Sequence, residues 1–146
     1  MKKILLSLAL VFTTLISFSH NPDIILKDNK DGTMNISVKF PNDPGDAIGS
    51  EISIILDKPY NGSGKTIGGS LVLFQRNLGE TEEMTIYKPK TKKFHIHVFV
   101  MPGHEYDVTD IYPLSKAEKE KWNDMINNDS TLTQDEKDYL LGNKVD

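Results

Sequence analysis

Hydrophobic and polar residues alternate along much of residues 23–113, and this period of two is typical of half-buried β-strands. The clearest run extends from Met34 to Phe40, where apolar residues occupy every second position. Residues that favour turns, mainly Gly, Pro, Asn and Asp, separate the apolar runs. The pattern predicts about seven short strands, over residues 24–26, 34–40, 52–56, 71–74, 84–87, 94–101 and 106–112.

Short strands at regular spacing indicate a mainly β fold. We expect an immunoglobulin-like (Ig-like) or transthyretin-like β-sandwich. An open antiparallel sheet with helices packed across one face is the rival arrangement, and the number of strands does not separate the two.

After Pro113 the pattern changes to that of a helical hairpin. Ser115 followed by Glu118, and Thr133 followed by Glu136, have the spacing of two capping boxes. The apolar stripe of the hairpin is narrow, so we expect it to pack on the edge of the sandwich. Docking of an envelope protein partner through these helices is the functional alternative.

The first 19 residues have the order of a secretory signal peptide. Two lysines precede an apolar run over residues 4–16, and small residues follow at Ser17 and Ser19. That run is short for a membrane span, which needs about 20 residues, although an uncleaved anchor is the alternative. The predicted organisation is therefore a signal peptide (1–19), a β-sandwich domain (20–113) and a C-terminal helical hairpin (114–146). We expect a soluble protein of the bacterial periplasm or extracellular space, with no membrane insertion after cleavage.

Net charge restricts the classes of partner, and the cysteine content restricts how the core is stabilised. The 146-residue chain has a net charge of −4, which becomes −6 once Lys2 and Lys3 are removed with the signal peptide. An acidic protein is poorly suited to bind nucleic acid or an anionic membrane surface. The chain has no cysteine, so the core of an exported domain must be stable without disulfides.

Motifs for catalysis are weak. The segment 64–66 (Gly-Lys-Thr) resembles the end of a phosphate-binding loop, but Pro59 occupies the position of the required earlier glycine. The segment 28–32 resembles a calcium loop, but Lys30 occupies a ligand position. We interpret both segments as turns and expect a protein that is not an enzyme.

The histidines are the most informative residues. His95 and His97 lie two apart in a predicted strand, so they share one face, with Cα atoms roughly 6.5–7 Å apart. Alternation also places Met101 on that face, and His104 follows the next turn. Imidazole suits copper and nickel, and a thioether favours copper(I). The alternative is a pair of polar residues on a solvated face and an unrelated turn histidine.

His20 adds to this hypothesis. Cleavage after Ser19 would give His20 a free α-amino group, and an N-terminal histidine chelates a metal through its amine and its ring. The predicted metal site therefore contains His95, His97 and His104, with Met101 and His20 as further ligands. The function that follows is binding or delivery of copper or nickel, and the alternative is a protein-interaction module of an envelope assembly without a metal.

Three short motifs support a family resemblance, and they occur in the order Asp28-Asn29-Lys30-Asp31-Gly32-Thr33, Gly45-Asp46-Ala47-Ile48-Gly49-Ser50-Glu51-Ile52 and Met101-Pro102-Gly103-His104-Glu105. Together they resemble small periplasmic proteins with a carboxypeptidase-regulatory-like, transthyretin-type β-sandwich. The resemblance covers about residues 22–112, and it departs between Gly68 and Pro89 and in the two helices. It implies a sandwich fold and a role in bacterial nickel, cobalt or copper handling.

Overall fold

The computed structural model describes residues 21–145, which form eight strands in two antiparallel sheets followed by two helices. The predicted signal peptide and His20 lie outside the described residues. Sheet A has the strand order β1-β2-β6, and sheet B has the order β4-β5-β3-β7-β8. The strands are β1 (Asp23–Asp28), β2 (Thr33–Lys39), β3 (Glu51–Pro59), β4 (Thr66–Ile67), β5 (Ser70–Asn77), β6 (Glu83–Tyr87), β7 (Phe94–Met101) and β8 (His104–Val108).

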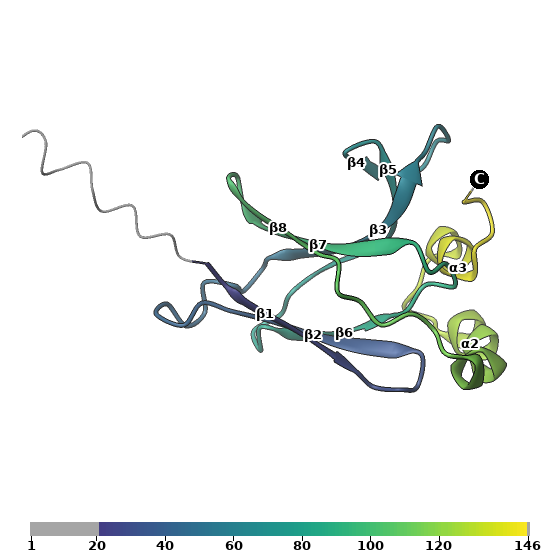
Figure 1. Ribbon diagram of the computed structural model, residues 1–146, viewed down its shortest axis with the longest axis horizontal. Coiled ribbons are helices and arrows are strands. Elements are labelled where there is room, and N and C mark those ends of the chain that lie inside the picture. Colours follow the sequence, from purple (N-terminus) through teal and green to yellow (C-terminus); the bar gives the residue numbers. More distant parts are fainter. Residues whose placement is uncertain (1–20, 146) are drawn as a thin grey trace, which may run out of the picture.

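The two sheets are stacked as layers, which Figure 1 shows edge-on, and we call this pair of sheets the sandwich. Alternate side chains of each sheet enter the space between them. Met34 and Ile36 of sheet A, and Ile54 and Ile96 of sheet B, have no exposed surface. The prediction of a mainly β fold is confirmed, and the strands form two sheets rather than one open sheet.

The predicted strands are all present, but their bounds differ in places. Both β3 and β5 extend three residues further than expected, to Pro59 and Asn77. The two-residue strand β4 was not predicted, because a pair of residues carries no periodic signal. The last strand begins earlier and ends earlier than expected, at His104 and Val108. It begins earlier because only Pro102 and Gly103 separate it from β7 in a tight hairpin.

The segment between β1 and β2 is a hairpin turn, as predicted, and its acidic side chains bond to the turn itself. Asp28 Oδ1 accepts a hydrogen bond from the Lys30 amide at 2.8 Å, and Asp31 Oδ1 accepts one from the Thr33 amide at 2.9 Å. Gly32 has φ of +95°, a conformation that glycine adopts without strain.

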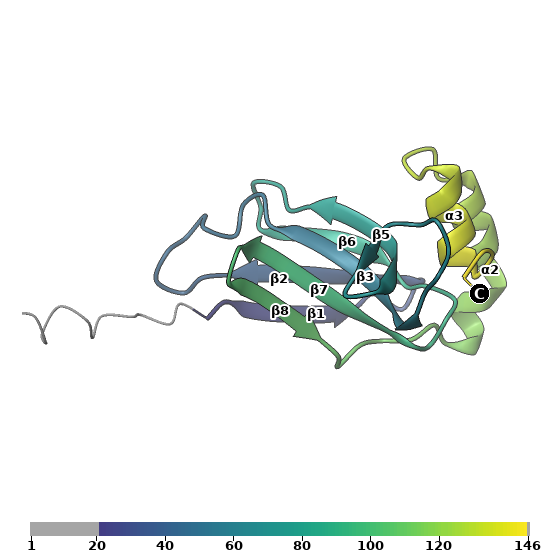
Figure 2. The same cartoon turned by 90° about the horizontal axis from the view of Figure 1, so that it is seen from above.

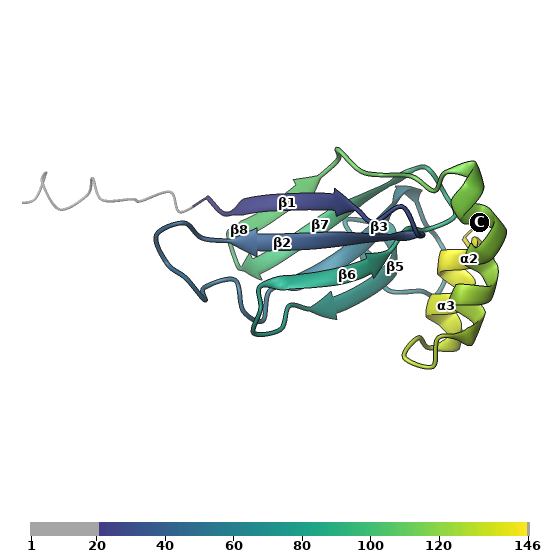
Figure 3. The same ribbon diagram turned by 90° about the horizontal axis from the view of Figure 1, so that it is seen from below.

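Both helices, α2 (Lys116–Asn128) and α3 (Gln134–Leu141), lie against one end of the sandwich (Figures 2 and 3). Trp122, Ile126 and Leu140 are almost fully buried in the same core as the strands. The narrow apolar stripe therefore packs on the sandwich, and a partner that binds the hairpin would contact its polar surface. Among residues 21–145, no helix is long and apolar enough to cross a membrane.

Both predicted capping boxes are present, and each of their glutamates also pairs with a cation of the sandwich. Glu118 in α2 lies 2.5 Å from Nζ of Lys88, which follows β6. Glu136 in α3 pairs with the guanidinium of Arg76 in β5. Each helix N-terminus is thus bonded to the sandwich through the glutamate of its capping box.

Lys88 is the most deeply buried charge of the described residues, with a fully buried side chain. Its Nζ lies 2.7 Å from Asp28 Oδ1 as well as bonding Glu118. Glu118 also accepts a hydrogen bond from the Gly32 amide at 3.0 Å. Burial favours the neutral form of Glu118, but the bonds from Lys88, Ser115 and Gly32 outweigh it and lower the pKa of Glu118 to about 2.

Candidate functional site

Two histidines and three carboxylates gather on the outer face of sheet B. In the strand register, His97 of β7 is opposite Asp107 of β8. His95 lies on the same face of β7, and Asp57 approaches it from the end of β3. Glu105 lies two residues before Asp107, so it shares that face of β8. We call these five residues the histidine–carboxylate row.

Each imidazole of the row is held by an aspartate at one nitrogen. His95 Nδ1 is 2.5 Å from Asp57 Oδ1, and His97 Nδ1 is 2.7 Å from Asp107 Oδ1. A carboxylate at Nδ1 favours the tautomer with its proton on Nδ1, so the lone pair lies on Nε2. This carboxylate–histidine arrangement is typical of metal-ligating histidines, because it fixes the tautomer and the orientation of the ring.

The Nε2 atom of each histidine faces a second carboxylate. The distance is 3.8 Å from His95 Nε2 to Asp107 Oδ1, and also 3.8 Å from His97 Nε2 to Glu105 Oε2. Two ligand atoms about 2.1 Å from a tetrahedral metal ion lie about 3.4 Å apart. Small side-chain rotations would therefore let each nitrogen–oxygen pair bind one ion. Within the described part of the chain, however, no three His, Cys, Asp or Glu side chains converge as a ready metal site.

The imidazoles of the row are more deeply buried than its carboxylates. The side chain of His97 is 11% exposed, whereas that of Asp107 is 60% exposed. The histidines are therefore fixed by the sheet while the acidic groups face solvent. A cation arriving from solvent would meet the carboxylates first. It would then exchange one of its bound water molecules for an imidazole nitrogen.

The structure does not bring Met101 and His104 to this face. A β-bulge between Phe99 and Met101 interrupts the alternation of β7 and pairs Met101 with His104. Both residues line a hollow of about 300 Å³. They flank the tip of the β7–β8 hairpin, which lies at the opposite end of the sandwich from the helices (Figure 2). Periodicity alone places Met101 beside the histidines, and a bulge is the feature that periodicity does not reveal. The predicted ligand His20 lies outside the described residues.

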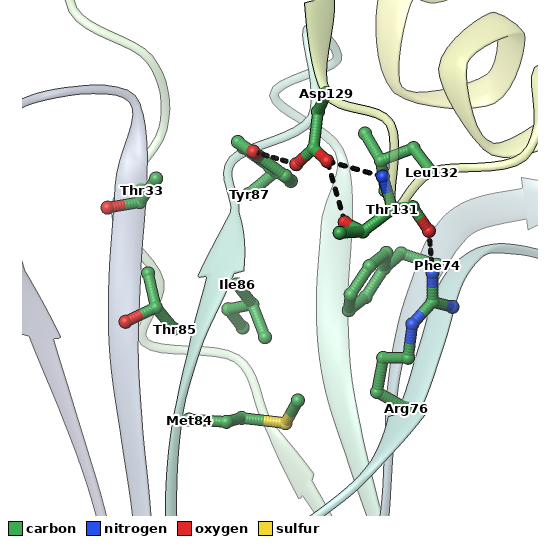
Figure 4. Close-up of a pocket in the computed structure, with 10 residues that line it drawn as sticks. All are labelled: Thr33, Phe74, Arg76, Met84, Thr85, Ile86, Tyr87, Asp129, Thr131 and Leu132. Carbon is green, nitrogen blue, oxygen red and sulfur yellow. Dashed lines mark hydrogen bonds between the residues drawn. The ribbon is translucent and has the colours of Figure 1, made fainter. Parts of the chain in front are cut away.

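A second hollow, of about 280 Å³, lies between β5, β6 and the connection from α2 to α3 (Figure 4). Phe74, Met84 and Ile86 give it an apolar wall. At its rim Tyr87 donates a hydrogen bond to Asp129, which also accepts one from the Thr131 amide at 2.7 Å. Burial and this hydrogen bond raise the pKa of Tyr87 to about 12.

The charged groups around this second hollow pair with one another. Arg76 stacks over the ring of Phe74 and bonds both oxygens of Glu136. Its charge is thus used to hold α3 rather than directed at a ligand. Sequence reasoning did not identify this hollow, because its walls come from segments that are far apart in the chain and carry no shared motif.

Comparisons with known proteins do not assign the site. No protein-family model, no curated protein and no solved structure matches the chain. The resemblance to transthyretin-type periplasmic proteins therefore stays a prediction.

Proposed function

We propose that this protein is an exported, non-enzymatic binding protein that carries divalent transition-metal ions, such as copper(II) or nickel(II), on the nitrogen–oxygen pairs of the histidine–carboxylate row. The observation that carries the proposal is the paired environment of His95 and His97. Each has an aspartate at Nδ1 and a second carboxylate within 3.8 Å of Nε2. Nitrogen and oxygen ligands of this kind suit borderline divalent ions.

The proposed fold assignment is Ig-like. In that class, strands A, B and E form one sheet while C, F and G form the other. The strand orders β1-β2-β6 and β4-β5-β3-β7-β8 correspond to A-B-E and to a C-F-G sheet extended beside C by β5 and by the two-residue strand β4. Under this assignment, the row lies on the outer face of strands C, F and G.

The number of protein ligands implies modest affinity and rapid exchange. Each Nε2 has one carboxylate oxygen in reach, so water would complete the coordination of the ion. An ion held in this way remains accessible to another protein that offers more ligands. The row is therefore better suited to metal delivery than to permanent storage, since closed four-ligand sites are the usual form of structural metal centres.

Calorimetric titration of residues 20–146 with copper(II) and nickel(II) tests the proposal. We expect the His95→Gln/His97→Gln variant to lose at least 10-fold in affinity, because both nitrogen ligands are gone. Asp57→Asn should weaken binding less, because Asp57 orients His95 without contacting the metal. His104→Gln is the matched control in the nickel(II) titration, because it removes a histidine outside the row and should leave the nickel(II) affinity unchanged.

Two results would overturn this function. One is the absence of binding by the native protein to either ion. The other is equal affinity in the native protein and the double histidine variant. Thermal unfolding of each variant without metal verifies that a lost affinity is not a lost fold.

A further inference from the structure

The β7–β8 hairpin places a thioether and an imidazole opposite each other at its tip. Met101 and His104 are Cα partners in the strand register and enclose the turn formed by Pro102 and Gly103. Directly opposed residues of antiparallel strands have Cβ atoms about 4.5–5.5 Å apart. The two side chains are therefore within reach of a common small ligand.

The hollow lined by these residues has one unsatisfied polar group. The Nδ1 atom of His104 is buried and has no hydrogen-bond partner. Buried nitrogen atoms are almost always paired, so an unpaired one requires an explanation such as a bound ion. Met101 lies beside it with half of its surface exposed, and therefore remains open to an ion arriving from solvent.

The other walls of the hollow are also suited to a cation. Phe40 and Val100 contribute apolar surface, and Asp43 and Asp46 contribute negative charge. These carboxylates would attract a positive ion, while the apolar residues would exclude part of its water. The hollow lies among residues on the inner side of sheet B, whereas the histidine–carboxylate row lies on the outer side.

We propose that Met101 and His104 bind one copper(I) ion, through the thioether sulfur of Met101 and Nδ1 of His104. Thioether ligands favour copper(I) over the divalent ions of the same series, and imidazole binds copper in either state. Copper(I) differs in this respect from nickel(II) and zinc(II), for which a thioether is a poor ligand. The site thus takes a soft monovalent ion, while the row takes a borderline divalent one.

This inference does not depend on the proposed function, because the two sites share no residue. Loss of one should leave the other intact. The Met101 and His104 variants should keep their affinity for nickel(II), and the His95→Gln/His97→Gln variant should keep its affinity for copper(I). Failure of each proposal is therefore visible separately.

Anaerobic competition with the copper(I) chelator bicinchoninate tests the site. The native protein should withdraw one equivalent of copper(I) from the chelator. Met101→Leu and His104→Gln should each weaken copper(I) binding at least 10-fold. Met101→Leu preserves the size of an exposed side chain, so its loss of affinity would not reflect unfolding.

Silver(I), a redox-inert substitute for copper(I), gives an independent measurement. Its addition should shift the methyl resonance of Met101 in the NMR spectrum of the native protein and leave the other methionines unshifted. The proposal is overturned if the native protein withdraws no copper(I), if Met101→Leu binds copper(I) as the native protein does, or if silver(I) leaves the Met101 methyl unchanged.

Discussion

Replacement of Glu118 by glutamine should destabilise the protein strongly at neutral pH. Glutamine has nearly the same size and retains one oxygen for capping, but it removes the negative charge beside Lys88. The Lys88 side chain is fully buried and that of Glu118 is only 5% exposed. A buried ion pair is costly to break, and the Lys88 charge would keep only Asp28, 2.7 Å away and 26% exposed, as its partner.

The size of the expected loss in the free energy of unfolding follows from the pKa of Glu118. A fall from the usual 4.5 to about 2 in the folded protein corresponds to about 3 kcal/mol of stability at pH 7, at about 1.4 kcal/mol for each pH unit. A depressed pKa stabilises the fold above pH 4.5, and this contribution is lost as the pH falls toward 2. At pH 3 about 1.4 kcal/mol of it should remain.

Urea unfolding followed by tryptophan fluorescence measures this effect. Trp122 is the only tryptophan of the chain and is 2% exposed, so its emission reports the loss of the core. Glu136→Gln is the matched control, because it changes the same capping position in α3. Its partner, Arg76, is 36% exposed, and such a pair contributes about 1 kcal/mol or less.

The reasoning is refuted if Glu118→Gln costs no more than Glu136→Gln at pH 7. It is also refuted if the cost of Glu118→Gln is the same at pH 3 as at pH 7. The first result would mean that the buried charge pair adds nothing beyond capping, and the second that ionisation of Glu118 is not linked to folding.

Two further substitutions test the junction between the helices and the sandwich. Trp122→Ala should lower the free energy of unfolding by about 3–5 kcal/mol in a calorimetric melt, because it empties a large buried volume; a cost under 1 kcal/mol would contradict the burial described above. Gly32→Ala should cost clearly more than Gly103→Ala in urea unfolding. Both glycines have positive φ, but only at Gly32 would a Cβ meet Trp122, at 2.8 Å, and equal costs would contradict this close approach.

The fold was largely predictable from the sequence because its signals are local. Alternation over residues 34–40 identifies β2, and the Ser115–Glu118 spacing identifies the start of α2. The partners of Glu118 were not predictable, because Lys88 and Gly32 reach it only after the chain has folded. Nothing in the sequence around Lys88 distinguishes it from the exposed lysines nearby.

The candidate site was predictable only in part, for a similar reason. The spacing of His95 and His97 places both on one face without knowledge of the fold. Asp57 and Asp107 join them through the register of three strands, which depends on loop lengths and on long-range pairing. The bulge that moves Met101 away is likewise a property of pairing between strands.

The bonds from the capping glutamates to the sandwich also bear on the order in which the chain can fold. Glu118 bonds the amide of Gly32 across 86 positions, and Glu136 bonds Arg76 across 60. Because synthesis runs from the N-terminus, the sheets are made before the helices that close one end of their core. Contacts of such long sequence separation form slowly, and these two bonds cannot form until α2 and α3 have been made. Such a delay suits the proposed export, since an unfolded chain can still be threaded through a narrow pore.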